Sequence, residues 1–370
     1  MRRELESPSR MIILPYLQDL PKIGPDATAD PTSAVIGRTE LGAGCHLEPL
    51  ATLRADGEQI SVGSDCWFGE ASTVHIADSV FPARVGAHVT VGRYGLVHAC
   101  TVADGCVIGE SAVVMDGSEV GSGSVIAAES VVPPGKTLEG GWLYAGTPAR
   151  PVERISSERL EKLHRLLRGT AGREPDASSI DAQILRATRP VGALRRRAGS
   201  GVAELAAAEA YIAPSASVAG ELHLGRHSSV WFGVEINADD AVVELGEDSN
   251  IQDHSRLCLA PGERLRIGRR VTVGHNVRMA ACEIEDEAII GMGSIIGKGT
   301  VVRAGGCVAA GAITEPGTEV AAGYVWSGRP ARESRILSPQ NRSLFALGVD
   351  VYVQYAKNYR ARAASSLLSP

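Results

Sequence analysis

An aliphatic residue returns at every sixth position over long stretches of this 370-residue chain. The clearest series are Val35, Leu41, Leu47 and Leu53; Val102, Ile108, Val114, Val120, Ile126 and Val132; Val218, Leu224, Val230, Ile236 and Val242; and Ile284, Ile290, Ile296, Val302 and Val308. A period of six fits neither the 3.6-residue repeat of a helix nor the two-residue alternation of a strand. It is typical of a parallel β-helix of triangular section, in which each hexapeptide makes one short strand and one corner and the aliphatic side chain points inward.

Glycine often follows the aliphatic residue, as in Val62-Gly63, Val91-Gly92 and Val273-Gly274. We expect the small residue to let the backbone turn at the corner. The 42 glycines and the low aromatic content of 4% suit many short strands with tight corners and argue against a helical protein. The sequence therefore predicts an all-β solenoid.

One twelve-residue motif occurs twice, at residues 89–100 and again at 271–282. Where the first copy has Arg93 the second has His275, and where the first has His98 the second has Ala280. Each copy keeps the histidine that the other has lost. We infer two tandem domains that share one site.

The two halves end with similar pentapeptides, Gly-Thr-Pro-Ala-Arg150 and Gly-Arg-Pro-Ala-Arg332. After the first, Ser156–Leu167 has a serine cap and apolar residues at helical spacing, which predicts a helix on a solenoid face. The end of the chain, with Tyr355 before a short polar run, predicts a terminal helix covering an otherwise exposed face. The predicted organisation is a first β-helix domain with its closing helix, a linker in which residues 180–185 could form a turn of helix, and a second β-helix domain with a C-terminal helix, at residues 1–168, 169–203 and 204–370.

Charge and cysteine content exclude several classes of protein. The net charge of −6 is mild and there is no long basic run, so nucleic acid is not an expected partner. Seven cysteines without a Cys-x-x-Cys pair predict buried thiols in a reducing compartment. The apolar residues 11–14 before Pro15 are too few for a signal peptide or a membrane span, so we expect a soluble cytoplasmic protein with no membrane partner.

A set of motif residues is divided between the two halves. The first half contains Arg54-Ala-Asp56, His75 and His98, and the second contains Asn-Ile-Gln252-Asp253 and His275. With these residues, both halves resemble the γ-class carbonic anhydrases and their hexapeptide-repeat relatives across nearly the whole of each domain. The resemblance implies two tandem left-handed parallel β-helices.

The resemblance also implies a metal site. In that family zinc is held between subunits, by two histidines of one and the Gly-His histidine of the next. Here His75 and His98 would come from the first domain and His275 from the second, with the fourth position open to water and with Zn, or another divalent metal such as Fe or Co, as the ion. The pairing of domains within one chain or between copies points to a homo-oligomer.

The opposite interface would bring together Arg93, Cys258 and Ala280. A cation stands there in place of the metal, and burying it unpaired costs several kcal/mol. We expect that interface to be empty, although Glu70 could pair with Arg93. Cys258, which replaces a ligand, is expected to be a buried thiol.

The resemblance assigns catalytic roles to Arg54, Asp56, Gln252 and Asp253. Arg54 would form an ion pair with Asp253 beside the metal, and Gln252 would help to place the bound water. Zinc lowers the pKa of its water to roughly 7, and the hydroxide then attacks carbon dioxide or another small carbonyl substrate. The chain would be a zinc-dependent lyase of carbonic anhydrase type.

Two alternatives remain open. Many hexapeptide-repeat proteins bind acyl-coenzyme A and use a single histidine base, so His75 or His98 could serve an acyltransferase. The second alternative is an assembly protein in which both halves have lost their chemistry. Fold resemblance alone does not decide between these functions.

Overall fold

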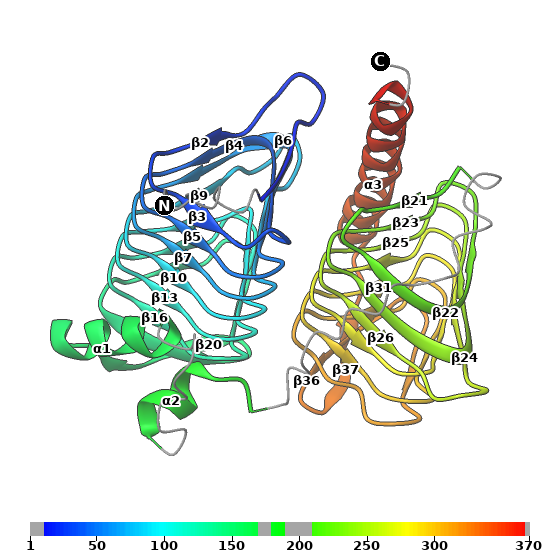
Figure 1. The fold of residues 1–370 in the computed structure, drawn as a ribbon. Coiled ribbons are helices and arrows are strands. Elements are labelled where there is room, and N and C mark those ends of the chain that lie inside the picture. Colours follow the sequence, from blue (N-terminus) through cyan, green and yellow to red (C-terminus); the bar gives the residue numbers. More distant parts are fainter. Residues whose placement is uncertain (1–10, 169–178, 189–208, 367–370) are drawn as a thin grey trace. The chain divides into compact units, whose positions relative to one another are not determined.

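The computed structural model describes residues 11–168, 179–188 and 209–366. The chain divides into two compact units, Met1–Pro190 and Val191–Pro370. Each unit is a β-solenoid of stacked coils (Figure 1). The chain is an all-β solenoid protein of two tandem left-handed parallel β-helices with flanking α-helices, as predicted. Most of the predicted linker at 169–203 lies outside the described residues, so its bounds stay a prediction.

The first unit contains two sheets. One contains β3 (Thr28–Ala29), β5 (His46–Leu47), β7 (Trp67–Phe68), β10 (Thr90–Val91), β13 (Val107–Ile108), β16 (Val125–Ile126), β19 (Trp142–Gly146) and β20 (Ala149–Arg154). The other contains β1 (Ile12–Leu14), β2 (Lys22–Ile23), β4 (Ala34–Leu41), β6 (Thr52–Val62), β8 (Thr73–His75), β9 (Ala83–Val85), β11 (Leu96–His98), β12 (Thr101–Val102), β14 (Val113–Val114), β15 (Glu119–Val120), β17 (Val131–Val132) and β18 (Thr137–Leu138). Because β6 pairs with β8 at its start and with β9 at its end, this second sheet supplies two faces of the solenoid.

The second unit repeats this plan. One sheet contains β21 (Tyr211–Ile212), β23 (Ser229–Val230), β25 (Asn250–Ile251), β28 (Thr272–Val273), β31 (Ile289–Ile290), β34 (Cys307–Val308), β36 (Tyr324–Gly328) and β37 (Ala331–Ile336). The other contains β22 (Ser217–Leu224), β24 (Glu235–Leu245), β26 (Arg256–Cys258), β27 (Arg264–Ile267), β29 (Arg278–Met279), β30 (Glu283–Ile284), β32 (Ile295–Ile296), β33 (Val301–Val302) and β35 (Glu319–Val320). The similar pentapeptides at the ends of the two halves contain the turns of two equivalent antiparallel pairs, β19 with β20 and β36 with β37.

The six-residue series fill the two cores, with one exception. Side chains such as Ile126 in the first unit and Val302 in the second are almost fully buried within them. Val242 was expected to point inward, but it is only half-buried and its neighbour Val243 takes the core position. The six-residue register shifts because β24 has extra residues at this point. Gly220 pairs with Ala238, and the next residue of β22 pairs with Val242.

The glycines after the aliphatic residues have a different role from the one we expected. A Cβ on Gly63 would lie 2.5 Å from the backbone nitrogen of Ala87, and one on Gly274 would lie 2.8 Å from that of Met292. Neither glycine has a positive φ, whereas the corner residues Asp65 and His88 do. Glycine is therefore needed where successive coils approach each other, rather than for left-handed backbone.

Helices cover one sheet of each unit. In the first unit α1 (Ser157–Arg168) and α2 (Ile180–Leu185) pack Leu163 and Leu185 over the β13 and β16 strands. The backbone N–H of Arg159 donates to Oγ of Ser156 at 3.3 Å, which confirms the predicted cap. In the second unit α3 (Pro339–Ser366) lies along β21, β23, β25 and β28, which confirms the predicted terminal helix (Figure 1). Among the described residues no helix is long and apolar enough to cross a membrane.

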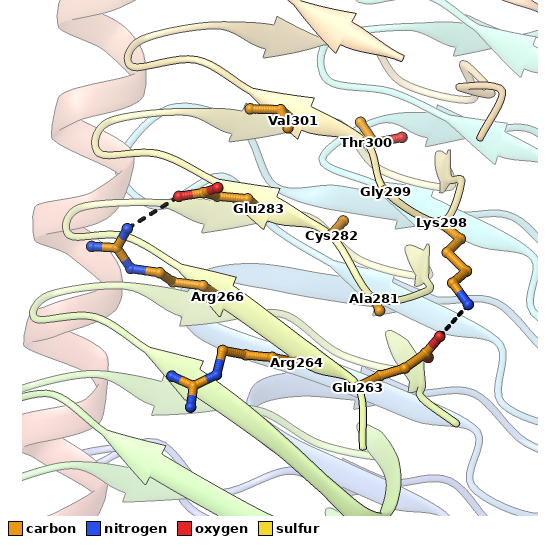
Figure 2. Close-up of a pocket in the computed structure, with 10 residues that line it drawn as sticks. All are labelled: Glu263, Arg264, Arg266, Ala281, Cys282, Glu283, Lys298, Gly299, Thr300 and Val301. Carbon is orange, nitrogen blue, oxygen red and sulfur yellow. Dashed lines mark hydrogen bonds and ion pairs between the residues drawn. The ribbon is translucent and has the colours of Figure 1, made fainter. Parts of the chain in front are cut away.

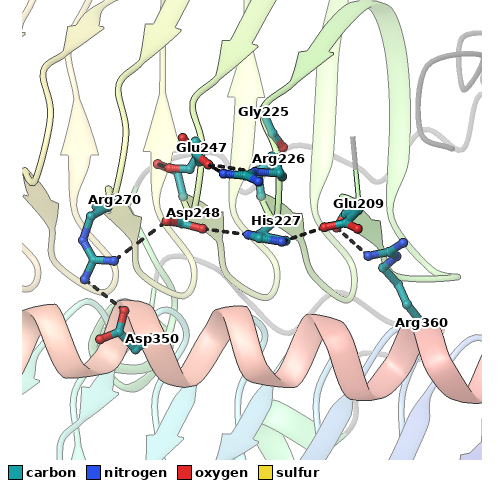
Figure 3. Close-up of polar contacts among 11 residues, drawn as sticks. Glu209, Gly225, Arg226, His227, Glu247, Asp248, Arg270, Asp350 and Arg360 are labelled. Carbon is teal, nitrogen blue, oxygen red and sulfur yellow. Dashed lines mark hydrogen bonds and ion pairs between the residues drawn. The ribbon is translucent and has the colours of Figure 1, made fainter. Parts of the chain in front are cut away.

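Aromatic side chains and ion pairs attach α3 to the second unit. Tyr359 stacks on Tyr211 with ring centroids 5.3 Å apart and meets the edge of Trp231 at 5.6 Å. Figure 3 shows the polar contacts at the helix, in which Arg270 pairs with Asp350. The helix therefore belongs to the second solenoid and covers the corner that carries His275.

Candidate metal site

His75 and His98 lie side by side on one face of the first unit. His98 at the end of β11 is the register partner of His75 at the end of β8, and His75 is the partner of Arg54 in β6. The two imidazole rings are 5.3 Å apart between centroids and meet edge to face at 71°. Because parallel strands stack in register, equivalent positions on neighbouring coils form a column of side chains. The fold therefore brings together the two predicted histidine ligands of the first domain.

Each of these rings uses Nδ1 for a hydrogen bond. Nδ1 of His75 is 2.6 Å from the backbone oxygen of Arg54, and Nδ1 of His98 is 2.6 Å from Oδ1 of Asp116. A carbonyl or carboxylate oxygen can only accept, so Nδ1 carries the hydrogen and Nε2 carries the lone pair in the neutral ring. Metal-binding histidines are held in this way by a carbonyl or carboxylate on the second nitrogen.

Arg54 and Asp56 are both buried and form an ion pair within β6. Asp56 therefore compensates the guanidinium of Arg54 inside the first unit. We had expected the partner of Arg54 to be Asp253, and that pairing stays a prediction.

In the second unit His275 follows β28 at a solenoid corner and is fully buried. Its Nδ1 lies 3.2 Å from Oδ2 of Asp253, which is itself fully buried. The other oxygen of Asp253 accepts the backbone N–H of Phe232 at 3.0 Å. A carboxylate this close to Nδ1 favours the tautomer with the hydrogen there, which is the tautomer that the hydrogen bonds of His75 and His98 also favour.

Gln252 is buried beside Asp253, and its amide nitrogen donates to Oδ1 of Asn250 at 3.1 Å. Its Oε1 has no hydrogen-bond partner among the described residues. A buried carbonyl oxygen of this kind is suited to accept a hydrogen bond from a bound water or substrate. The role expected for Gln252 stays a prediction.

The matching face of the second unit has no histidine at the positions equivalent to His75 and His98. Cys258 pairs in register with Asn237 as His75 pairs with Arg54. The expectation that Cys258 is buried is wrong, because it stands at the outward end of β26 and is exposed. The other six cysteines are buried free thiols, as predicted. Burial raises the pKa of the Cys282 thiol to about 12, so this thiol stays protonated.

Arg93, the counterpart of His275, is not an unpaired cation. Its Nε donates to Oε1 of Glu110 at 3.1 Å, and its Nη1 lies 3.8 Å from Glu70. Oε2 of Glu110 also accepts the backbone N–H of Ala187. The expected cost of an uncompensated guanidinium therefore does not arise, because two carboxylates of the same unit neutralise it.

Three residues near these sites were missed from the sequence. Asp116 holds His98, Glu110 holds Arg93, and the hydroxyl of Tyr352 in α3 lies 3.3 Å from Nε2 of His275. Asp116 follows His98 by 18 residues, three hexapeptides later. A search along the hexapeptide column could therefore have found it.

Two other polar regions of the second unit are compensated internally. An open pocket of about 430 Å³ lies over β27, β30 and β33, with Arg266 paired to Glu283 and Lys298 to Glu263 (Figure 2). Elsewhere the ligand atoms of His227, Glu247 and Asp248 lie within 4.8 Å of one another.

In this second region, however, Arg226 binds Glu247 through two nitrogens (Figure 3). His227 lies between Glu209 and Asp248. These partners account for the charges, so we assign no metal to either region.

Comparison with known proteins supports the resemblance. No protein-family model matches the sequence. "Gamma carbonic anhydrase 1, mitochondrial" of Arabidopsis thaliana is 37% identical over 165 residues, which cover 43% of this chain and 60% of that protein. "Protein YrdA" of Escherichia coli is 37% identical over 152 residues, which cover 39% of this chain and 83% of that protein.

A solved structure of a hexapeptide transferase family protein from Anaplasma phagocytophilum is 31% identical, with a TM-score of 0.39 and coverage of 41% of this chain and 89% of that one. The match thus spans less than two thirds of the Arabidopsis relative but most of the bacterial ones. The stacked coils define a hexapeptide-repeat β-helix protein, and the relatives at 37% identity place it with the carbonic anhydrase type. The chain belongs to the γ-carbonic anhydrase-like family of hexapeptide-repeat proteins.

Proposed function

We propose that this chain is a metal-dependent hydratase of the γ-carbonic anhydrase type with a single composite site. His75 and His98 of the first unit and His275 of the second hold one divalent ion, zinc in the first instance. The observation that carries the proposal is common to the three rings: an accepting oxygen faces each Nδ1, so Nε2 carries the lone pair that a metal would use. Three imidazoles are a donor set that zinc accepts in catalytic sites.

The complementary losses support the pairing of unlike units. The second unit has Cys258 and Ala280 where the first has His75 and His98, and the first has Arg93 where the second has His275. Unlike units, from one chain or from two copies, can complete three ligands, whereas like units cannot. This predicts one metal per chain.

The ion would lower the pKa of a bound water to about 7 and so supply a nucleophile for carbon dioxide or another small carbonyl compound. The protein residues orient the reactants. Gln252 would accept a hydrogen bond from the bound water through Oε1, and its amide nitrogen is held by Oδ1 of Asn250. The buried pair of Arg54 and Asp56 keeps a fixed charge arrangement beside His75, and Asp253 fixes the ring of His275.

Metal analysis with variants tests this function. Purified wild-type protein should contain about one divalent ion per chain and hydrate carbon dioxide, and His75→Ala, His98→Ala and His275→Ala should each lose both properties. His46→Ala is the control, because both ring nitrogens of His46 already have partners in the first unit, the hydroxyl of Thr28 and the carboxylate of Glu48. Two ions per chain, or none after expression with added metal, would count against the composite site.

A mixing experiment tells pairing within one chain from pairing between copies. If the site forms between copies, His98→Ala and His275→Ala proteins that are unfolded and refolded together should regain part of the metal and activity. If it forms within a chain, the mixture should stay inactive. Normal hydration of carbon dioxide by His275→Ala alone would rule out the composite site. A metal-loaded wild-type protein that hydrates no carbon dioxide would leave the acyltransferase and assembly alternatives in front.

A further inference from the structure

The ring of His275 has a second polar neighbour. Tyr352, on the helix α3, places its hydroxyl oxygen 3.3 Å from Nε2 of His275. Tyr352 is 8% exposed and His275 is fully buried, so the contact is shielded from solvent. This nitrogen is the one that the proposed function assigns to the metal.

The tautomer of His275 decides which group donates. The carboxylate of Asp253 faces Nδ1 and favours a hydrogen there, so Nε2 is the acceptor in the neutral ring. The phenol of Tyr352 is then the donor in an O–H···N hydrogen bond. A metal ion needs the same lone pair, so the hydrogen bond and the metal cannot use Nε2 together.

Packing holds Tyr352 in place. Its ring meets the edge of Trp231 at 5.2 Å and lies 5.5 Å from Tyr355. The ion pair of Arg270 with Asp350 lies two residues before it on the same helix. The hydroxyl is therefore aimed at His275 by a packed helix rather than by a mobile loop.

We propose that Tyr352 is a positioning residue of the metal site, which holds Nε2 of His275 by a hydrogen bond in the metal-free protein and gives it up when a metal binds. The inference rests on the proposed function. Metal binding at His275 then competes with the hydrogen bond from Tyr352 to Nε2 of His275. The affinity of the site for the metal is therefore lower than it would be with the three histidines and no tyrosine hydroxyl.

Tyr352→Phe tests this competition, because it keeps the packed ring and removes only the hydroxyl. Metal-free full-length protein is titrated with zinc or cobalt against a chelator of known affinity. Loss of one hydrogen bond in the metal-free state should tighten the dissociation constant about fivefold, the equivalent of about 1 kcal/mol. Tyr359→Phe, on the same helix and in the same aromatic cluster, should change it less than twofold.

The outcomes separate the inference from the proposed function. If wild-type protein binds no metal, the proposed function fails and the competition fails with it. If wild-type protein binds metal and Tyr352→Phe binds it equally well or more weakly, the proposed function stands and the role of Tyr352 is overturned. Circular dichroism of each variant checks that the helix is retained.

Discussion

Nε of Arg93 donates a hydrogen bond to Oε1 of Glu110 at 3.1 Å, at the position that corresponds to His275 in the second copy of the motif. The carboxylate is almost fully buried, whereas the guanidinium is 42% exposed. The first unit has therefore replaced the histidine with an ion pair. The guanidinium at this corner is therefore a compensated cation.

Glu110→Gln should destabilise the first unit by about 1 kcal/mol, because it removes the negative partner of a partly exposed arginine. The neutral amide oxygen can still accept the backbone N–H of Ala187, so the contact with the segment after α2 should survive. Urea unfolding measures the change, with Glu119→Gln, an exposed glutamate of the same unit, as control. Equal stability of both variants would show that the pair contributes nothing.

Asp116→Asn should weaken metal binding about 10- to 100-fold while the fold is retained. The carboxylate fixes the hydrogen on Nδ1 of His98, and an amide can instead present its N–H₂ group and favour the wrong tautomer. A metal titration measures the effect, and Asp65→Asn, an exposed carboxylate elsewhere in the unit, should bind normally. Unchanged affinity in Asp116→Asn would remove Asp116 from the site.

The sequence predicted the parts of the protein that follow from period and register. A six-residue repeat places equivalent side chains in columns. The core residues and the neighbouring positions of His75 and His98 could therefore be predicted from the sequence. The prediction failed at Val242, where an insertion in β24 breaks the count, and at Cys258, where the outward end of a strand leaves the thiol exposed.

Contacts between the solenoid and the helix α3, which lies outside the repeat, could not be predicted for a different reason. The approach of Tyr352 to His275 depends on how α3 is rotated and seated on its sheet, and tertiary packing sets both. No periodicity links a residue of the terminal helix to one particular corner. Asp116 lies within the repeat, but it falls outside the twelve-residue motif at 89–100 that drew attention to His98.

His164 should make the first unit less stable as the pH falls below about 6.5. His164 belongs to α1, and its ring packs against the solenoid at Thr90. Burial, with the nearby charge of Arg168, lowers its pKa from the usual value. Between the two pKa values the unfolded chain binds the proton and the folded chain does not. Stability is therefore complete above about 6.5 and declines as the pH falls toward the lowered pKa.

Urea midpoints at pH 7.5 and 5.5 measure this decline. His164→Gln should flatten it, because glutamine does not titrate in this range. His223→Gln should leave the decline as it is in the wild type, since the side chain of His223 is about half exposed. The same pH slope in wild type and His164→Gln would rule out His164 as its source.

The attachment of α3 should depend on its aromatic residues far more than on its ion pairs. Asp350 is 60% exposed in its pair with Arg270, and exposed pairs contribute about 0.2–1 kcal/mol, so Asp350→Ala should cost less than 1 kcal/mol. Tyr359 is 6% exposed and packs against Tyr211, Trp231 and Phe232. Removing a buried aromatic ring costs about 3–5 kcal/mol, so Tyr359→Ala should release the helix.

Urea unfolding followed by circular dichroism compares the two variants, at low and at high salt. Tyr359→Ala should unfold at clearly lower urea at both salt concentrations, because burial of apolar surface is not screened by ions. Asp350→Ala should differ from wild type only slightly, and less at high salt. Equal losses in the two variants would contradict the prediction, because the ion pair of Arg270 with Asp350 in Figure 3 would then hold the helix, and with it Tyr352, as strongly as the buried ring does.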